Sequence, residues 1–320
     1  MVKLSVKDMK ILRELDFGAR QPISQIAKKV GLSPEVTHYR IKQLEKQGII
    51  TGYYPVIDLS KLGYLYCRLI MQLEKITPEM EDDFFVFARK HSSIGWVVLL
   101  DNWRLVYVFY VQNIPEAQQV IEEITFRFPT LIRERQPSIA TRIYHFRRKY
   151  LYGKNDDERM VWGGGNEFQV DALDQKIIGC LTKNARIPCT EIAAQVKVSS
   201  VAVMNRIKRM EQQGLILGYR CALDLKKLGY TSIKVFLYLE NVTKLRKGVL
   251  KEYLQQWLHC VYLTESFEKA DFEFECHVLN LYVLHEFMKK MKAAFPEVRN
   301  HDSFINYREE IIRYAPKNFF

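Results

Sequence analysis

Residues 19–53 read ARQPISQIAKKVGLSPEVTHYRIKQLEKQGIITGY, and this stretch decides the fold. A short amphipathic helix precedes Gly31, and Ser33 followed by proline predicts the start of another. Gly48 predicts the end of that helix. The apolar residues after it predict a strand that turns at Gly52, which has the shape of a wing. With one more helix expected before it, the stretch predicts a winged helix-turn-helix.

The helix that follows Ser33 has two different faces. Thr37, Ile41 and Leu44 recur at i, i+4 and i+7, which predicts the buried side. A recognition helix meets base edges with its N-terminal half and phosphates with its basic residues. A solvated helix face is the alternative for each residue. The predicted DNA contacts of the first unit are Lys28, Lys29, Ser33, Glu35, His38, Tyr39, Lys42, Gln43 and Lys46, with His38, Tyr39 and Gln43 at bases.

The same stretch returns 166 positions later as ARIPCTEIAAQVKVSSVAVMNRIKRMEQQGLILGY, residues 185–219. Between residues 8–64 and 174–230, 26 of 57 positions are identical without a gap, which indicates a tandem duplication. The second recognition helix has more apolar residues on its outward face. We therefore expect the first unit to supply more sequence specificity. The predicted DNA contacts of the second unit are Ser199, Asn205, Lys208 and Arg209.

The net charge of +11 lies on these two units. Residues 1–64 hold 11 Lys or Arg against 6 Asp or Glu, and residues 174–230 hold 10 against 4. Outside these two segments the charges balance. Such concentrated positive charge favours a polyanionic partner such as double-stranded DNA, although a solvated basic surface is the simpler alternative.

Each unit is followed by segments whose apolar period alternates between that of a strand and that of a helix. The order β-α-β-β-α-β predicts a ferredoxin-like sandwich, so the fold class is α+β with two repeats. The strand LVYVFYV, residues 105–111, is apolar on both faces, which indicates a second sheet packed on the first. In the first repeat we expect strands at 65–73, 94–100, 105–111 and 139–146, and helices at 79–90 and 115–128. In the second we expect strands at 231–239, 260–267, 272–278 and 303–313, and helices at 246–258 and 281–295.

The predicted domains follow from these elements. They are a winged helix-turn-helix at 1–64, a ferredoxin-like domain at 65–150, a flexible linker at 151–170, a second winged helix-turn-helix at 171–230 and a second ferredoxin-like domain at 231–320. The linker mixes charged residues with three consecutive glycines.

The strand at 272–278 alternates strictly and places Glu273, Glu275 and His277 on one face. These three side chains are a candidate cation or ligand site. The alternative, which we favour, is a solvated or salt-bridged sheet face, because carboxylates at i and i+2 are common in half-exposed strands. If the two sheets pack together, Arg68 or Arg104 could offset the acids.

Other classes of site have little support in the sequence. The six cysteines show neither disulfide nor zinc spacing, so we expect free thiols and no metal. No nucleophile elbow, phosphate loop or HExxH motif is present, so we expect neither an enzyme nor a cofactor. The start of the chain lacks a secretory apolar core and no run is long enough to cross a membrane, which predicts a cytoplasmic location.

The motifs of both halves resemble the Lrp/AsnC (leucine-responsive, or feast/famine) regulators of bacteria and archaea. The resemblance implies a transcription regulator that pairs its ferredoxin-like domains, here within one chain, with higher homo-oligomers and a small-molecule effector open. The family usually has a Gly-containing turn near its amino-acid site, whereas residues 101–104 and 268–271 contain no glycine. In the first half the matching residues are Ala19, Arg20, Ile26, Ala27, Leu32, Ser33, Arg40, Ile41, Leu44, Glu45, Gly48, Gly52, Tyr53, Asp58, Leu62, Gly63 and Tyr64.

Two other functions stay open at this point. An architectural protein that coats DNA would have the same charge with little sequence preference. Sirohaem decarboxylases are built from paired Lrp-like subunits, so a tandem chain could be such an enzyme. For Arg40 and Arg206, an internal salt bridge and a phosphate contact are equally consistent with the sequence.

Overall fold

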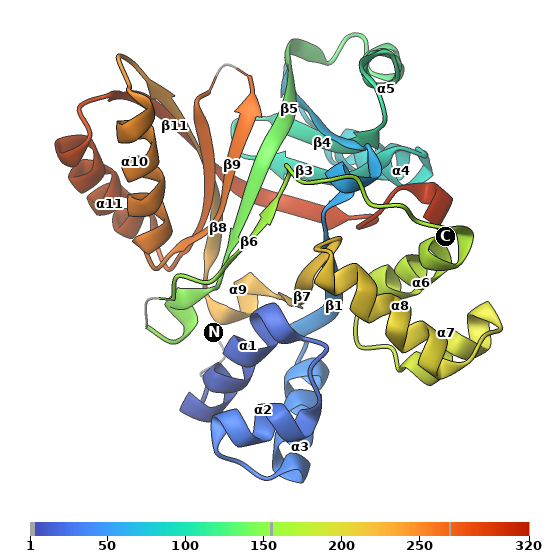
Figure 1. Cartoon of the computed structure of the whole chain (residues 1–320). Helices are drawn as coiled ribbons and strands as arrows, with labels where there is room; N and C mark the ends of the chain where they lie inside the picture. The colour runs from blue at the N-terminus through green and yellow to red at the C-terminus, as the bar shows by residue number, and fades with distance from the viewer. Residues whose placement is uncertain (1–3, 154–155, 269, 320) are drawn as a thin grey trace.

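A computed structural model describes residues 4–153, 156–268 and 270–319. Two repeats of the same element order follow one another (Figure 1). Residues 1–3 of the predicted first domain, residues 154–155 of the predicted linker, residue 269 of the second predicted turn and residue 320 lie outside the described residues.

Each repeat begins with three helices and a strand, as predicted. The first set is α1 (Val6–Gly18), α2 (Ile23–Val30), α3 (Pro34–Lys46) and β1 (Ile50–Ile57). The second set is α6 (Ala172–Lys183), α7 (Cys189–Val196), α8 (Ser200–Gln212) and β7 (Ile216–Leu223). Ser5 and Asp8 form a reciprocal capping box at the start of α1, which stabilises the first turn.

The prediction that the chain turns back at Gly52 is wrong. Strand β1 runs through Gly52 and pairs antiparallel with β7 of the other repeat, with Tyr53 opposite Cys221 and Pro55 opposite Tyr219. The sequence suggested a local hairpin because the glycine follows a short apolar run. Strands β1 and β7 thus form one two-stranded ribbon, and the helices of both repeats are attached to it.

The remaining elements form two β-α-β-β-α-β units, which confirms the predicted order. The first contains β2 (Leu65–Leu73), α4 (Pro78–Lys90), β3 (Ile94–Leu100), β4 (Arg104–Val111), α5 (Ile114–Arg127) and β5 (Ile132–Phe146). The second contains β8 (Thr231–Leu239), α10 (Lys244–Gln256), β9 (Cys260–Phe267), β10 (Phe272–Val278), α11 (Leu281–Ala294) and β11 (Val298–Ile311). Short helical turns are η1 (Leu59–Leu62), η2 (Lys149–Leu151), α9 (Leu225–Leu228) and η3 (Lys317–Phe319). The helices lie on the outer faces of the strands (Figure 1).

The last strand of each unit crosses into the other repeat. Strand β5 pairs with β2 along its first half and with β9 along its second half. Strand β11 likewise pairs first with β8 and then with β3. The eight strands therefore close into a ring in the order β2-β4-β3-β11-β8-β10-β9-β5, which covers the edges of both sheets.

Both crossing strands begin earlier than the sequence indicated. Strand β5 begins at Ile132 instead of 139, and β11 begins at Val298 instead of 303. Four of the seven added residues of β5 are exposed and three of these are charged, so the segment lacks the apolar alternation that predicts a strand. Backbone pairing with β2, and not side-chain burial, holds this segment in the sheet.

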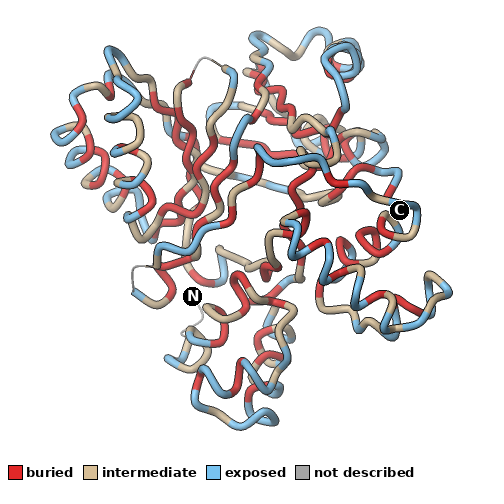
Figure 2. The backbone as a smooth tube through the Cα atoms, viewed as in Figure 1, coloured by how far each residue is buried: buried red, intermediate tan, exposed pale blue. Residues whose placement is uncertain are grey.

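The two apolar faces predicted for residues 105–111 are confirmed. Leu105, Tyr107 and Phe109 pack against α4 and α5 in one core. Val106 and Val108 face the interior of the ring, where they belong to a second cluster with residues of β8 and β11. Figure 2 shows buried residues along the strands of both units. The second sheet therefore covers the face that the helices leave open.

Part of the predicted linker is ordered, in contrast to the expected flexible coil. Its residues 159–162 form strand β6 (Arg159–Trp162), which pairs with the end of β5. Gly163 follows with a left-handed φ of 92°, and a Cβ there would lie 2.3 Å from the carbonyl oxygen of Thr141. A glycine is therefore required where this segment crosses the sheet.

The turn between β3 and β4 needs a conformation that glycine adopts easily, although it contains none. Asn102 and Trp103 have left-handed φ angles of 53° and 59°. Asparagine tolerates this region, but tryptophan rarely does. A Gly-containing turn, as the Lrp/AsnC family usually has, would relieve that strain.

Candidate nucleic-acid interface

Helices α2 and α3 project away from the strands (Figure 1). Thr37, Ile41 and Leu44 are buried, which confirms the predicted core side of α3. Gln43 is half-buried at the edge of the opposite face. The predicted contacts that are exposed in this unit are Lys28, Lys29, Ser33, Glu35, His38, Tyr39, Lys42 and Lys46.

Local contacts hold part of this face in place. The Ser33 hydroxyl caps α3 by accepting a hydrogen bond from the Val36 N–H at 3.3 Å. Lys42 pairs with Glu45 at 2.8 Å, and Lys29 pairs with Glu14 of α1 at 3.0 Å. These surface pairs are weak, so both lysines can still turn to a phosphate.

The second unit presents a smaller polar face. Asn205 and Lys208 of α8 are exposed, and Ser199 caps the helix by accepting from the Ala202 N–H at 3.2 Å. Arg209 is also exposed, but its guanidinium binds the buried carboxylate of Asp174 within its own unit. Arg209 is therefore less available to DNA than the sequence indicated.

Arg40 and Arg206 form internal salt bridges in both units. Arg40 binds Asp8 at 2.9 Å, and Arg206 binds Asp174 at 2.9 Å. Each arginine thus ties its recognition helix to the first helix of the same unit. Of the two roles considered for these residues, the structure shows the salt bridge.

The two units also hold each other through reciprocal contacts. The guanidinium of Arg20 donates to the carbonyl oxygens of Ala185 and Ile187 at 2.7 Å, and Arg186 donates to the Ala19 carbonyl oxygen. A backbone carbonyl oxygen of β1 accepts a hydrogen bond from the Ala185 N–H, and one of β7 accepts from the Ala19 N–H at 2.9 Å. These contacts explain why an Ala-Arg pair stands in both repeats.

Each recognition helix is capped from the other repeat. The Lys61 ammonium donates to the Gln213 carbonyl oxygen at the end of α8 at 2.7 Å, and Lys227 donates to Gln47 at the end of α3 at the same distance. A cation is favourable at a helix C-terminus because it offsets the free carbonyl groups. The two caps fix the orientation of one recognition helix relative to the other.

The double substitution Lys61→Ala and Lys227→Ala tests this coupling. Both contacts are exposed, so we expect a loss of only about 1 kcal/mol in the free energy of unfolding, measured in urea. The discriminating measurement is DNA binding to a set of operators with different half-site spacing. The natural chain should prefer one spacing, and the variant should bind neighbouring spacings almost as well. An unchanged preference would show that other contacts set the orientation.

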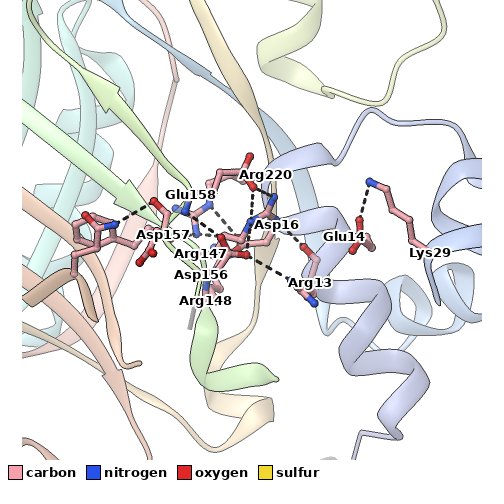
Figure 3. A network of polar contacts seen from close by, with 12 residues as sticks. Arg13, Glu14, Asp16, Lys29, Arg147, Arg148, Asp156, Asp157, Glu158 and Arg220 are labelled. Atoms are coloured by element: carbon pink, nitrogen blue, oxygen red, sulfur yellow. Dashed lines mark hydrogen bonds and ion pairs between the residues drawn. The ribbon is translucent and has the colours of Figure 1, made fainter. Parts of the chain in front are cut away.

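A buried ion triad joins the two units beneath the ribbon (Figure 3). Asp16 of α1 accepts from Arg148 after β5 at 2.6 Å and from Arg220 of β7 at 2.8 Å. All three residues are buried. Burial alone would raise the pKa of Asp16, but the charges of Arg220 and Arg148 lower it further than burial raises it. Asp16 is therefore ionised and couples the first helix to both the sheet and the second unit.

The equivalent position in the second repeat has different chemistry. Thr182, Tyr314 and Tyr54 stand where the first side has Asp16, Arg148 and Arg220. Tyr54 and Tyr314 stack with ring centroids 4.5 Å apart. Ions support one side of the ribbon and stacked rings the other. Aligning the repeats reveals this difference, but not that the residues meet.

The candidate ligand residues of β10 lie inside the ring. Glu273 binds both Arg68 and Lys234, and Glu275 accepts from the Ser232 hydroxyl at 3.0 Å. His277 contacts the Tyr150 hydroxyl at 2.7 Å. The favoured alternative of a solvated or salt-bridged sheet face is confirmed in its salt-bridged form, and Arg68 offsets Glu273 as predicted. Arg104 lies instead over the Phe304 ring at 4.4 Å.

Other classes of site were searched among the described residues. No group of three or more His, Cys, Asp or Glu side chains there could hold a metal ion. All six cysteines are free. No helix of the described ranges is long and apolar enough to cross a membrane.

Comparison with known proteins identifies two helix-turn-helix segments. Residues 4–51 match the model of a winged helix-turn-helix DNA-binding domain, and residues 170–211 match the AsnC-type helix-turn-helix domain. The chain is 41% identical over 66 residues to the HTH-type transcriptional regulator LrpA of Pyrococcus horikoshii, which is 21% of this chain and 47% of that protein. The chain thus spans about half the length of this relative.

Two further similarities cover more of each protein. The regulatory protein AsnC of Haemophilus influenzae is 27% identical over 146 residues, 45% of this chain and 95% of that one. The crystal structure of the siroheme decarboxylase NirDL superposes with a TM-score of 0.63 over 98% of this chain and 96% of that chain, at 13% identity. At this identity the second match shows the shared two-repeat fold alone. Each half therefore carries a helix-turn-helix segment, of the AsnC type in the second half, and the chain is similar to Lrp/AsnC regulators.

Proposed function

We propose that the chain is a sequence-specific DNA-binding transcription regulator in which the two fused repeats act together as a pseudo-dimer. The relatives named as regulators support this role for the helix-turn-helix units. The strand exchange between the repeats supports their action as one unit. On this proposal the partner is double-stranded DNA, and the protein acts where the genome is, in the cytoplasm of a bacterium or archaeon.

One observation carries the proposal. Helices α3 and α8 expose polar and basic residues, and Lys61 and Lys227 each bind the end of the recognition helix of the other repeat. Two recognition helices held in one orientation can read two half-sites at a set spacing, about 34 Å per helical turn of DNA. Because the two faces differ, we expect an imperfect palindrome.

The test is selection of bound sequences from a random DNA pool, followed by fluorescence anisotropy with the selected site and with random DNA. We expect affinity for the selected site to exceed that for random DNA by about 10³-fold or more. Lys46→Ala should reduce the salt slope by about one with little change in sequence preference. Equal affinity for both DNAs would favour an architectural DNA-coating protein instead.

The difference between the two recognition helices gives a further prediction. Tyr39 is exposed on α3 and Asn205 is exposed on α8, at equivalent positions of the two units. We expect Tyr39→Ala to weaken binding to the selected site by about tenfold or more, and Asn205→Ala by less. Anisotropy titrations with operators altered in one half-site at a time measure both effects. Equal losses would contradict the proposed asymmetry.

The full-length similarity to NirDL raises an enzyme as the second candidate. A related crystal structure shows that enzyme in complex with an iron-uroporphyrin III analogue. Uroporphyrins carry many carboxylates, so such a site needs unpaired cations. Here the interior cations Arg68 and Lys234 already bind Glu273, and Arg148 binds Asp16. A tetrapyrrole absorption band in the purified protein would nevertheless establish this candidate over DNA regulation.

A further inference from the structure

Two adjoining cavities lie inside the strand ring and beneath the ribbon. The inner one has a volume of about 140 Å³ and the outer one about 480 Å³. An engineered apolar cavity of about 150 Å³ is large enough to bind benzene. The residues that line both cavities are Tyr54, Trp96, Tyr262, Glu275, Ile311 and Tyr314.

The inner cavity is apolar at one end and polar at the other. Val98, Val106 and Val108 line it on the side of β3 and β4, where Val106 and Val108 belong to the interior cluster. His145 lines it from β5, and its buried Nδ1 has no hydrogen-bond partner. Burial first, and then the charge of Arg220, lower the pKa of His145 to about 3, so the imidazole is neutral. A ligand in this cavity would meet apolar walls and the unpaired Nδ1 of His145.

The two cavities are lined by charged side chains of both signs, and Lys183 is one of the cations of the outer cavity. In the inner cavity Arg68 and Lys234 pair with Glu273, and Lys234 also lies 3.9 Å from Glu275. In the outer cavity Arg148 is paired with Asp16. Glu309 of β11 lines the outer cavity, where its side chain is solvent-accessible.

Glu309 forms no ion pair within the described part of the chain, although Lys183 lines the same cavity and the charge of Lys234 acts on Glu309. Its carboxylate accepts from the Asn306 amide, and no Lys, Arg or His of the described residues forms an ion pair with it. Burial among protein atoms, together with the nearby charge of Glu275, raises the pKa of Glu309 to about 7. A positive group placed beside Glu309 and Glu275 would offset the charge of Glu275 and stabilise the ionised form of Glu309.

We propose that these cavities bind a small organic ammonium ion, with its apolar body in the inner cavity and its charged head beside Glu275 and Glu309. The aromatic side chains of Trp96, Tyr262 and Tyr314 stand around the position of the head, and aromatic faces attract cations. An anion or a zwitterion fits less well, because the carboxylates of Glu275 and Glu309 would repel a carboxylate placed beside them. The inference stands apart from the proposed DNA binding, since it concerns the interior of the ring.

Calorimetric titration of the full chain with 2-phenylethylammonium, at neutral pH and without DNA, tests the proposal. We expect saturable binding, and about tenfold weaker binding to Glu309→Gln. The matched control is Glu310→Gln, the next residue, whose side chain pairs on the outside with Arg89 at 2.7 Å. The control should bind as the natural chain does. 2-Phenylethanol and 3-phenylpropanoate should bind more weakly than the amine.

A second variant keeps the test independent of the carboxylate. Val108→Phe fills the inner cavity without altering any charge, and it should abolish amine binding while thermal unfolding shows a folded chain. The proposal is overturned if the amine gives no binding heat, if Glu309→Gln and Glu310→Gln lose affinity equally, or if 3-phenylpropanoate or phenylalanine binds more tightly than the amine. DNA titrations of the same variants are read separately.

Discussion

Replacing Asp16 with asparagine is expected to lower the free energy of unfolding by about 3–5 kcal/mol, one of the largest effects of a single substitution in this chain. The change leaves the guanidinium groups of Arg148 and Arg220 buried without a counter-charge. The cost comes from this uncompensated charge and exceeds what the intact triad contributes to stability. Urea unfolding followed by circular dichroism measures it.

The equivalent position of the second repeat supplies the control. Thr182 is also buried, and its hydroxyl donates to the Gly179 carbonyl oxygen within α6 at 2.9 Å. Thr182→Val removes one hydrogen bond and no charge, so we expect a loss of about 1 kcal/mol. Similar losses at the two positions would show that burial, and not the ion triad, sets the cost.

Acid should weaken the same triad. The folded pKa of Asp16 is lowered, so its contribution is present above the unfolded pKa of about 3.9 and is lost as the pH falls below that value. The natural chain should therefore lose stability on acidification below about pH 4 more steeply than Asp16→Asn does. Parallel pH profiles would contradict the assignment of this charge.

Arg68→Met is expected to cost a similar amount, about 3–5 kcal/mol. Arg68 lies inside the strand ring, where it binds Glu273 and also Glu268 at 3.0 Å. Without it, Glu268 loses its cation, and Glu273 keeps only the ammonium of Lys234, which also lies 3.9 Å from Glu275. The equivalent surface change is Arg89→Met, which breaks an exposed pair with Glu310 and should cost less than about 1 kcal/mol.

A second substitution separates charge balance from packing at this site. Arg68→Met combined with Glu268→Gln removes one cation and one carboxylate together, so the double variant should recover part of the loss. Burial would raise the pKa of Glu273, but Arg68 and Lys234 lower it to about 2. Its contribution is therefore present above the unfolded value of about 4.3 and is lost as the pH falls toward 2. A double variant no more stable than Arg68→Met would contradict the charge explanation.

Much of the fold could be predicted because local signals agree with it. The Ser-Pro start and the Thr37, Ile41 and Leu44 spacing fix α3, and the doubly apolar strand at 105–111 indicates a second sheet. The pairing of β1 with β7 could not be predicted, because it joins residues far apart in the sequence through backbone groups. The early start of β5 could not be predicted for the same reason, because backbone pairing with β2 holds its charged residues in the sheet.

The residues of the candidate site likewise differ in whether local sequence could predict them. Outward residues of α3 follow from helical periodicity, so their exposure was within reach of the sequence. The partner of Arg209, the Asp16 triad and the cavities depend on contacts between distant segments. Glu309 gave no signal in the sequence, because a carboxylate on an irregular, partly exposed strand is usually solvated. Its electrostatic environment depends on Lys234 of β8 and Glu275 of β10, which are distant in the sequence.

The interior of the strand ring has a consequence for how such a protein can evolve. In an assembly of two identical subunits, every side chain on the inner face is present twice, across a symmetry axis. Here Glu273 and Glu275 on β10 stand at positions that Val106 and Val108 occupy on β4. Two identical copies would place either four carboxylates or none in the interior of the ring. Joining the copies into one gene removed that constraint, so an uneven, enclosed chamber could arise by single substitutions on one side.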